Sequence, residues 1–354
     1  MDAKRLATRY VVHRKTTYLV LYIFLFIGCG TVATAQTIIF TGDILLDRGV
    51  RAAIDSAGIE HLFSPEIDSL FRTADAVVGN LECPATDIHR PVHKIYIFRA
   101  EPDWLHTLRR HGITHLNLAN NHTIDQGRIA MIDTRSNVLQ AGIIPIGADS
   151  TMAAAAQPVR IFPPFYRKEP CEPSSQKGEI TGGFPPSEKQ NQFSLSSPPL
   201  EGSGEVFLLS SVRLPLENFS YLPHRPSPSQ EPFDTLCARV TRLRQQKPEA
   251  IIIVSLHWGE EHALTPRPQQ VVEAHQLIDA GADALICHHT HTLQSIETYH
   301  GKPIYYSLGN FIFDPQRPIN RRAAIVALDI TPPTLSFRTI PIYIDGCTPR
   351  ILPE

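Results

Sequence analysis

The chain of 354 residues lacks an excess of either charge, because 33 lysines and arginines stand against 35 aspartates and glutamates. Nucleic-acid-binding domains usually carry a basic excess, so we expect no nucleic-acid partner. The six cysteines include no CxxC pair, which excludes a zinc ribbon or a thioredoxin-like motif and leaves one unassigned disulfide open. Ordinary glycine content and 42% hydrophobic residues exclude collagen-like and wholly disordered chains.

Long uncharged runs are also missing, except for one near the amino terminus. Residues 16–42 carry no charge and follow five basic residues. The apolar centre at 18–27 and the sequence Ala33-Thr34-Ala35 match a secretory signal peptide cleaved after Ala35. The run is also long enough for an uncleaved membrane anchor, and Cys29 stands in an imperfect lipobox. We therefore expect 1–35 to be a signal peptide or anchor, and the protein to be exported to the cell envelope, periplasmic or membrane-anchored.

After residue 36, short apolar runs alternate with amphipathic stretches, which is typical of an α/β domain with a largely parallel sheet. The expected strands are 37–41, 76–79, 113–119, 143–146, 205–209, 250–256 and 284–286. The expected helices are 64–74, 102–110, 127–139, 234–246 and 268–280. Three last strands, expected at 303–307, 323–330 and 335–344, have no helices between them, which favours antiparallel pairing.

Proline is unevenly distributed along the chain. Thirteen of the 30 prolines fall within 162–232, among serine, glycine, glutamine and lysine residues. Almost no periodic apolar pattern is present there. The stretch 168–204 is therefore predicted to be a disordered, proline-rich insertion in the α/β domain.

Polar residues with ligand chemistry recur where predicted strands end. They are Asp43, Glu82, His122, His257 and the pair His289 and His291. In open α/β sheets this edge is where ligands bind. Singly, each residue also has a structural explanation: a helix cap, an asparagine turn with a surface histidine, a buried core histidine or a histidine-rich loop.

Together with the adjacent Asn120 and Asn121, these residues supply carboxylate, amide and imidazole groups without requiring a thiolate. This donor set suits Mn, Fe or Zn. An H-x-H pair beyond a strand end can bring two imidazoles to one ion. Two divalent ions roughly 3.5–4 Å apart would activate water and neutralise a phosphoester, and Glu82 is the expected bridge between them.

Six motifs, in this order, resemble the CapA family of capsule-synthesis proteins, which is linked to poly-γ-glutamate production and export. They are Gly42-Asp43, Asn80-Leu81-Glu82, Asn120-Asn121-His122-Thr123, His257-Trp258-Gly259-Glu260, His288-His289-Thr290-His291 and the segment 306–314. The resemblance covers 37–160 and 205–330. That family is similar to calcineurin-like metallophosphoesterases, which implies one domain over 37–346 with an α/β/β/α sandwich and a dinuclear metal site.

The resemblance also implies roles for single residues. Asp43, Glu82, His122, His257, His289 and His291 would be metal ligands, and Asn120 or Asn121 would contact metal or phosphate. If the chain is an enzyme, we expect a metal-dependent hydrolase of the phosphoesterase type with His122, His257 and Asn121 as catalytic residues. Arg48 and Asn120 would bind substrate, although Arg48 could equally be a solvated arginine at a helix start.

Three functions follow as expectations. The first is an exported CapA-like protein that acts in synthesis or export of a poly-γ-glutamate-type capsule polymer, with membrane-bound capsule-synthesis partners. The second is an exported metal-dependent phosphoesterase. The third is a non-catalytic module that binds the anionic polymer. The expected substrate is accordingly an anionic polymer or a phosphoester.

Overall fold

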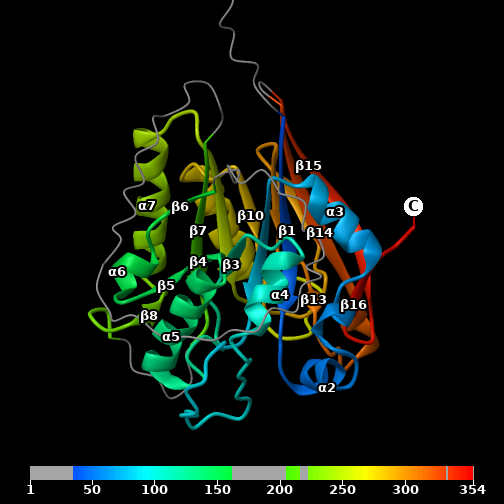
Figure 1. Ribbon diagram of the computed structural model, residues 1–354. Coiled ribbons are helices and arrows are strands. Elements are labelled where there is room, and N and C mark those ends of the chain that lie inside the picture. The colour runs from blue at the N-terminus through cyan, green and yellow to red at the C-terminus, as the bar shows by residue number, and fades with distance from the viewer. Residues whose placement is uncertain (1–34, 162–204, 216–221, 332–333, 354) are drawn as a thin grey trace, which may run out of the picture. The chain divides into compact units, whose positions relative to one another are not determined.

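The computed structural model describes residues 35–161, 205–215, 222–331 and 334–353 (Figure 1). The expected insertion at 168–204 and nearly all of the expected leader at 1–35 lie outside the described residues. Two β-sheets face each other, and helices cover their outer sides. The predicted α/β/β/α sandwich is therefore confirmed.

The first sheet has the strand order β16-β15-β14-β1-β2-β3-β4, and β13 also pairs with β1. Its strands are β1 (Gln36–Ile44), β2 (Ala76–Leu81), β3 (His115–Asn117), β4 (Ile144–Ile146), β13 (Asn310–Ile312), β14 (Arg322–Thr331), β15 (Thr334–Asp345) and β16 (Thr348–Ile351). Strands β1 to β4 are parallel to one another, whereas β14, β15 and β16 pair antiparallel. The predicted antiparallel pairing is thus confirmed for the strands expected at 323–330 and 335–344, whereas the strand expected at 303–307 is β12 (Lys302–Tyr305) of the second sheet and pairs parallel with its neighbour β10 (Ala284–Ile286).

The second sheet has the order β11-β12-β10-β9-β7-β6. Its strands are β6 (Val159–Ile161), β7 (Val206–Val212), β9 (Ile251–His257), β10 (Ala284–Ile286), β11 (Ile296–Tyr299) and β12 (Lys302–Tyr305). The four central strands are parallel, and the two edge strands are antiparallel to their neighbours. A separate short pair joins β5 (Ala148–Asp149) and β8 (Ser227–Pro228).

The helices connect the parallel strands, as βαβ units require. They are α2 (Arg48–Ala57), α3 (Pro65–Thr73), α4 (Trp104–Arg110), α5 (Gly127–Gln140), α6 (Met152–Ala155), α7 (Phe233–Gln246) and α8 (Pro268–Asp279), with short 3₁₀ turns η1 (Ile59–Leu62) and η2 (Pro318–Arg321). Helix α3 begins after Ser64 with proline at its first position, as predicted. Figure 1 shows α7 and α3 on opposite sides of the paired sheets.

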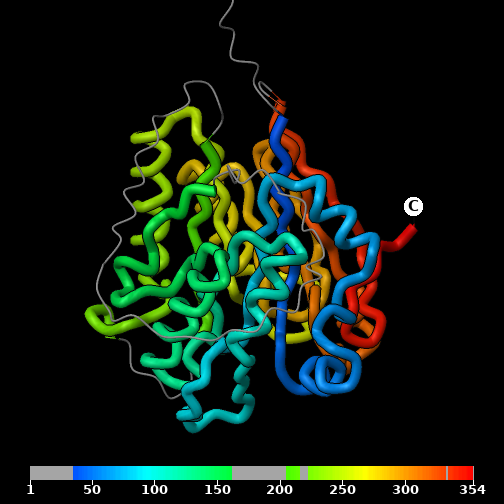
Figure 2. The backbone as a smooth tube through the Cα atoms, viewed as in Figure 1, coloured from blue at the N-terminus to red at the C-terminus, as the bar shows by residue number. Residues whose placement is uncertain are grey.

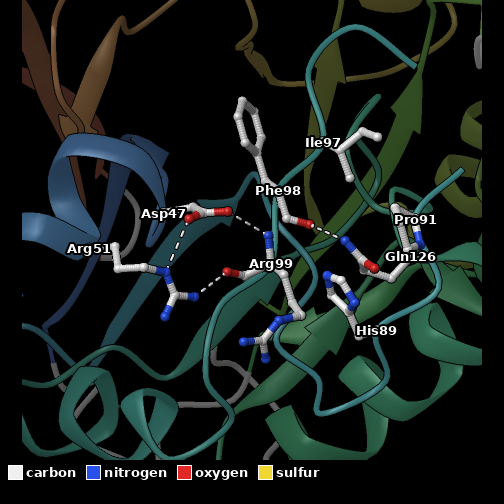
Figure 3. Close-up of a pocket in the computed structure, with 8 residues that line it drawn as sticks. All are labelled: Asp47, Arg51, His89, Pro91, Ile97, Phe98, Arg99 and Gln126. Atoms are coloured by element: carbon white, nitrogen blue, oxygen red, sulfur yellow. Dashed lines mark hydrogen bonds and ion pairs between the residues drawn. The ribbon is translucent and has the colours of Figure 1, made fainter. Parts of the chain in front are cut away.

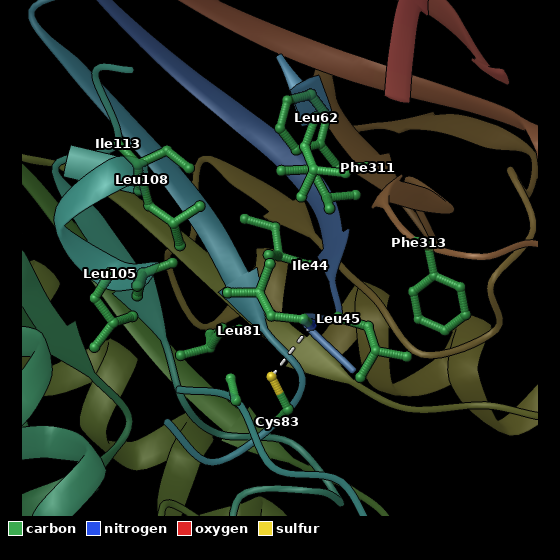
Figure 4. Packing of buried hydrophobic residues seen from close by; sticks show 14 of the residues in the cluster. Ile44, Leu45, Leu62, Leu81, Cys83, Leu105, Leu108, Ile113, Phe311 and Phe313 are labelled. Atoms are coloured by element: carbon green, nitrogen blue, oxygen red, sulfur yellow. Dashed lines mark hydrogen bonds between the residues drawn. The ribbon is translucent and has the colours of Figure 1, made fainter. Parts of the chain in front are cut away.

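Three apolar layers hold the sandwich together. On β1, Ile39 points into the layer beneath the helices of the first sheet, whereas Ile38 and Phe40 point into the layer between the sheets. This alternation is the period of two expected of a strand buried on both faces. Figure 4 shows the first layer, where Ile44 and Phe311 pack with side chains of neighbouring strands and helices. The third layer lies between the second sheet and α7 and α8.

The expected strands and helices are all present, with ends displaced by one to three residues. Helix α2 was missed, because its apolar pattern is reduced to two buried positions, Val50 and Ile54. Strands β11, β13 and β16 were missed because they are three or four residues long. The expectation of a largely parallel sheet holds for β1 to β4 in the first sheet and for the four central strands of the second, but not for β14 to β16 or for the edge strands β6 and β11.

The carboxyl ends of the central strands in both sheets point the same way. Strand β1 runs down to α2 in Figure 2, and the segment between β2 and α4 lies at the same lower edge. A close backbone approach fixes this edge: a Cβ at Gly42 would lie 2.1 Å from the carbonyl oxygen of Gly309. Only glycine allows β1 to approach the segment before β13 so closely.

Candidate functional site

Strands from both sheets place their final residues at one common edge. Asp43 lies near the end of β1, and Glu82 directly follows β2. His257 is the last residue of β9, and His289 and His291 lie in the turn that follows β10. All five side chains are buried. The structure therefore brings together five of the six residues that were predicted to converge, all except His122.

These residues form two groups with the chemistry of metal ligands. One consists of Glu82, His257 and His289, and the other of Asp43, Glu82 and His291. Within each group the ligand atoms lie within 4.8 Å of one another. Glu82 belongs to both groups, which is the position expected of a bridging carboxylate between two ions.

The individual distances show how compact the arrangement is. His257 Nε2 lies 3.3 Å from Glu82 Oε1 and 3.2 Å from His289 Nδ1. His291 Nδ1 lies 3.3 Å from Asp43 Oδ2, and its Nε2 lies 3.9 Å from Glu82 Oε1. One cation could thus contact several of these atoms after small side-chain adjustments.

Glu82 indicates that this arrangement suits a cation. Neither of its side-chain oxygens accepts a hydrogen bond from the described residues, although the carboxylate is almost completely buried. An ionised carboxylate in such surroundings is costly unless a positive charge compensates it. Oxygen and imidazole nitrogen donors without sulfur fit Mn, Fe or Zn, so the residues present fit a divalent metal.

The electrostatics of the acidic residues point the same way. Burial, followed by the charge of Asp43, raises the pKa of Glu82 well above its usual range. Burial would also raise the pKa of Asp43, but the facing imidazoles of His288 and His291 lower it well below its usual range. Burial opposes a charge on His291 as well, yet Glu82 and Asp43 raise its pKa to about 9. Without metal, a proton on His291 therefore offsets part of the negative charge.

The other two imidazoles are held neutral. Burial, and then the neighbouring His289, lower the pKa of His257 well below its usual value. Burial and His291 lower the pKa of His289 to about 3. Neutral imidazole is the form that binds metal ions, so both rings are ready to act as ligands.

The turn after β10 has unusual backbone geometry. His289 has a φ of 100° and His291 a φ of 56°, both in the left-handed region. Residues with a Cβ are rare there, and such strain concentrates at functional sites. Before the turn, His288 pairs with His257 in a parallel β-bridge, and His288 Nδ1 lies 3.4 Å from Asp43 Oδ1. The turn therefore aims several imidazoles at the end of β1.

Asparagines surround the two groups. Asn80 donates to Asp43 Oδ1 over 2.8 Å and lies 3.3 Å from His257 Nδ1. Asn121 Oδ1 lies 2.8 Å from His257 Nε2, so Asn121 is a candidate additional ligand. Asn120 is directed instead to the backbone, since its side chain donates to Leu81 O over 2.8 Å. Of the two adjacent amides, Asn121 is thus the one that faces the metal-ligand groups.

Asn310, at the start of β13, has a polar contact that the sequence did not reveal. Its Oδ1 lies 3.1 Å from His291 Nδ1, and Asn320 donates to the carbonyl oxygen of His291 over 2.8 Å. The segment around Asn310 belongs to the sixth of the sequence motifs. It also helps to orient one of the imidazoles.

His122 lies near both groups but belongs to neither. Its Nδ1 lies 2.7 Å from Asp125 Oδ2, and Lys94 Nζ lies 3.3 Å from the same nitrogen. Its role as metal ligand or catalytic residue stays a prediction. Lys94 and Asp125 were missed as site residues, although Asp125 follows His122 by three positions and that spacing was a usable signal.

Arg48 is the first residue of α2 and is 31% exposed. Its Nη2 lies 2.5 Å from Asp314 Oδ1, and its guanidinium lies between the rings of Phe98 and Phe313 at 5.3 and 5.1 Å from their centroids. The Phe313 ring lies 4.6 Å from that of His291. Arg48 therefore stands beside the site, and substrate binding by it stays a prediction.

A hollow of about 510 Å³ lies next to the site (Figure 3). Its lining residues are Asp47, Arg51, His89, Pro91, Ile97, Phe98, Arg99 and Gln126. The Phe98 ring lies 4.3 Å from the His122 ring, so Phe98 contacts both the hollow and the turn that carries His122. Arg51 pairs with Asp47, and both Arg51 and Arg99 pair with Glu101, so the positive charges here are balanced.

Several proteins are similar in sequence to this chain over most of its length. The sequence is 28% identical over 315 residues to the PGA biosynthesis protein CapA of Bacillus subtilis, covering 88% of this chain and 72% of that protein. It is 25% identical to the capsule biosynthesis protein CapA of Bacillus anthracis, covering 89% and 69%. It is 27% identical to a probable polyglutamine synthesis accessory protein of Mycobacterium tuberculosis, covering 78% and 74%.

Two solved structures are similar at low sequence identity. The calcineurin-like phosphoesterase YfkN from Bacillus subtilis aligns with a TM-score of 0.40 and 12% identity, covering 90% of this chain and 88% of that chain. The protein TT1561 of Thermus thermophilus aligns with a TM-score of 0.41 and 10% identity, covering 86% and 99%.

A family profile matches the chain over 37–164 and 208–315, which includes the end of every strand that carries a candidate ligand. Together the two segments span well over half of the sequence. The chain therefore belongs to the bacterial capsule synthesis protein family PGA_cap.

Proposed function

We propose that this protein acts in the synthesis or export of a poly-γ-glutamate-type capsule polymer and that a divalent metal site is part of its function. Family membership and the names of the relatives support the first part. The two ligand groups that share Glu82 support the second, and they are the observation that carries the proposal. Divalent ions bound there would act as Lewis acids and lower the pKa of water.

The residues around the ions have separable tasks in this proposal. Glu82 would serve both ion positions, with Asp43 and His291 at one and His257 and His289 at the other. Asn121 adds an amide oxygen beside His257. His122, held by Asp125, presents its other ring nitrogen for binding or for moving a proton, and Arg48 provides a positive charge for an anionic oxygen.

The hollow behind Phe98 gives an extended substrate a place to continue. A polymer bound at the strand ends would pass Phe98 and reach the charge-balanced surface around Arg51 and Arg99. The family and the names of the relatives support an anionic polymer as the substrate class, together with capsule-synthesis partners in the membrane.

The capsule function is tested by deleting the gene and measuring anionic polymer on the cell surface. We expect the polymer to disappear and to return with the wild-type gene but not with His289→Ala. His275→Ala is the matched control, because His275 lies on α8 and pairs with Glu297 outside the site. An unchanged cell surface after deletion would refute the proposal.

The metal site is tested separately by metal analysis of purified protein. We expect Glu82→Gln to lose both ions, since Glu82 is shared, and Asp43→Asn to keep the ion bound by His257 and His289. The thermal stabilisation by Mn²⁺, about 2.7 kcal/mol at a hundred times the dissociation constant, should vanish in Glu82→Gln. Equal metal content in wild type and Glu82→Gln would contradict the assignment.

The second candidate is an exported metal-dependent phosphoesterase, favoured by the His122–Asp125 pair beside two adjacent ligand groups. Purified protein with Mn²⁺ or Zn²⁺ should then hydrolyse an aryl phosphate, and His289→Ala should not. No turnover with any divalent metal would exclude it. Polymer binding that a chelator leaves unchanged would instead favour a non-catalytic binding module.

Export is proposed from the pattern in residues 1–35. Among the residues that the structure describes, no helix is long and apolar enough to cross a membrane. Cell fractionation should place the protein in the envelope or periplasm, and a cleaved protein should begin at Gln36. Recovery of the full chain in the cytosol would refute export.

A further inference from the structure

Lys94 lies in the segment between β2 and α4, and its charged side chain points into the interior of the protein. Its side chain is 6% exposed. The two residues that follow it, Ile95 and Tyr96, are 83% and 58% exposed. Burying a lysine costs several kcal/mol unless partners compensate the charge, so this placement requires specific contacts.

Two donors of the ammonium are directed to acceptors in one turn. Lys94 Nζ donates to Asn121 O over 2.8 Å and to Asp125 Oδ1 over 2.9 Å, and it lies 3.3 Å from His122 Nδ1. A lysine has three donors and no acceptor. Asn121 O and Asp125 Oδ1 use two of these donors, and both contacts are those of a residue that holds the turn in place.

Asp125 connects the lysine to His122. It is completely buried, and its Oδ2 accepts from Phe98 N over 2.8 Å and lies 2.7 Å from His122 Nδ1. The backbone supports the same connection, since Val92 N donates to Asp125 O over 2.9 Å. The segment 92–98 thus contacts the turn at 121–125, and Asp125 accepts hydrogen bonds from three of its residues.

The turn carries the residues that face the metal-ligand groups. Asn121 Oδ1 lies 2.8 Å from His257 Nε2, and Lys94 holds the carbonyl of the same asparagine. We propose that Lys94 is a positioning residue which, through Asp125 and the carbonyl of Asn121, holds Asn121 and His122 against the Glu82–His257–His289 group. The effect of Lys94 on metal binding rests on the proposed function, whereas the contacts that Lys94 makes with the turn do not.

The test compares Lys94→Met, Asp125→Asn and the double variant with the wild type. Lys302→Met is the matched control, because Lys302 has the same two kinds of partner. Its Nζ donates to the carbonyl oxygen of Ala282 over 2.8 Å and lies 3.3 Å from Asp283 Oδ1. Lys302 lies at the start of β12, at the opposite edge of the sheet. The first readout is hydrogen exchange of the amides in 118–127, and the second is Mn²⁺ affinity.

Lys94→Met should speed exchange in 118–127 about tenfold, because hydrogen bonds to charged groups are among the stronger ones. The rest of the chain should keep its rates, and Lys302→Met should leave 118–127 unchanged. Asp125→Asn should have the same local effect, which keeps the test valid if Lys94→Met does not fold. The double variant should be no worse than either single variant, since the two residues act as one unit.

The metal readout should change in parallel. Lys94→Met should weaken binding of one Mn²⁺ ion by about tenfold, the loss typical of residues that orient ligands, and leave the other ion in place. A wild type that binds no metal would defeat the proposed metal site, while the exchange result would still decide the role of Lys94. Unchanged exchange in 118–127, exchange raised equally along the chain, or additive effects in the double variant would overturn the proposal.

Discussion

Glu82 has the most unfavourable surroundings of the candidate ligands when no metal is bound. It is buried beside another carboxylate, Asp43, and accepts no hydrogen bond from the described residues. His291 compensates part of this charge by holding a proton, because the two carboxylates raise its pKa to about 9. The residue types at the strand ends were predictable from sequence, but the proton on His291, which the proposed metal ion would displace, was not. It depends on distances between side chains that are remote in the chain.

Metal binding should therefore release a proton between pH 7 and 9. A divalent ion needs neutral imidazole, so Mn²⁺ affinity should rise by about tenfold per pH unit and level off above pH 9. In the metal-free protein, the free energy of unfolding should change with pH in the opposite direction. The raised pKa of His291 stabilises the fold fully below the pKa of an unfolded histidine, near 6.5, and this contribution is lost as the pH rises through 9.

Calorimetry in two buffers of different ionisation enthalpy measures the proton release, and thermal unfolding in chelator measures the stability. His275→Ala should follow the wild type in both. A Mn²⁺ affinity that does not change between pH 7 and 9 would contradict the protonated state of His291.

At the scale of elements, the end of β1 and the turn after β10 determine where the ligands lie. Asp43 N donates over 3.0 Å to the carbonyl oxygen of Gly309, the same atom that a Cβ at Gly42 would meet. The strand and the turn were predictable, because apolar runs and glycines are local signals. Their mutual approach was not predictable, since the residues in contact are separated by most of the chain.

Gly42→Ala should destabilise the protein by about 1–3 kcal/mol, the cost typical of overpacking, and should weaken Mn²⁺ binding because Asp43 shifts. Gly301→Ala is the control: a Cβ there meets nothing within 4 Å, although its φ of 76° carries a cost of about 1 kcal/mol. Its metal affinity should equal that of the wild type. Denaturant unfolding and Mn²⁺ titration measure both effects, and wild-type behaviour of Gly42→Ala would show that the approach is not rigid.

At the scale of the whole molecule, the site exists because two sheets end at the same edge. The first sheet contributes Asp43 and Glu82, and the second contributes His257, His289 and His291. The long stretch between β6 and β7 is not needed to explain this arrangement. Ile161 and Val206 are direct antiparallel partners, as the two ends of a hairpin would be.

Replacing residues 162–205 by Asn-Gly should therefore leave the fold intact, because a two-residue turn of this kind connects directly paired strand ends. We expect an unfolding midpoint within a few degrees of the wild type and the same metal content. Thermal unfolding and metal analysis provide the measurement. A variant that fails to fold, or that folds without binding metal, would show that the stretch is part of the domain and not an insertion in it.

The sequence by itself determined most of the strands and helices and the chemical types of the ligands, because periodicity and strand-end residues are local properties of the chain. The resemblance of six ordered motifs extended this to the sandwich and to the convergence of the ligands. Only the tertiary structure decided that Asn121 and not Asn120 faces His257, and that Lys94 contacts the turn at Asn121 and Asp125. Those features depend on side-chain directions and on sheet packing, which bring together atoms that no local pattern relates.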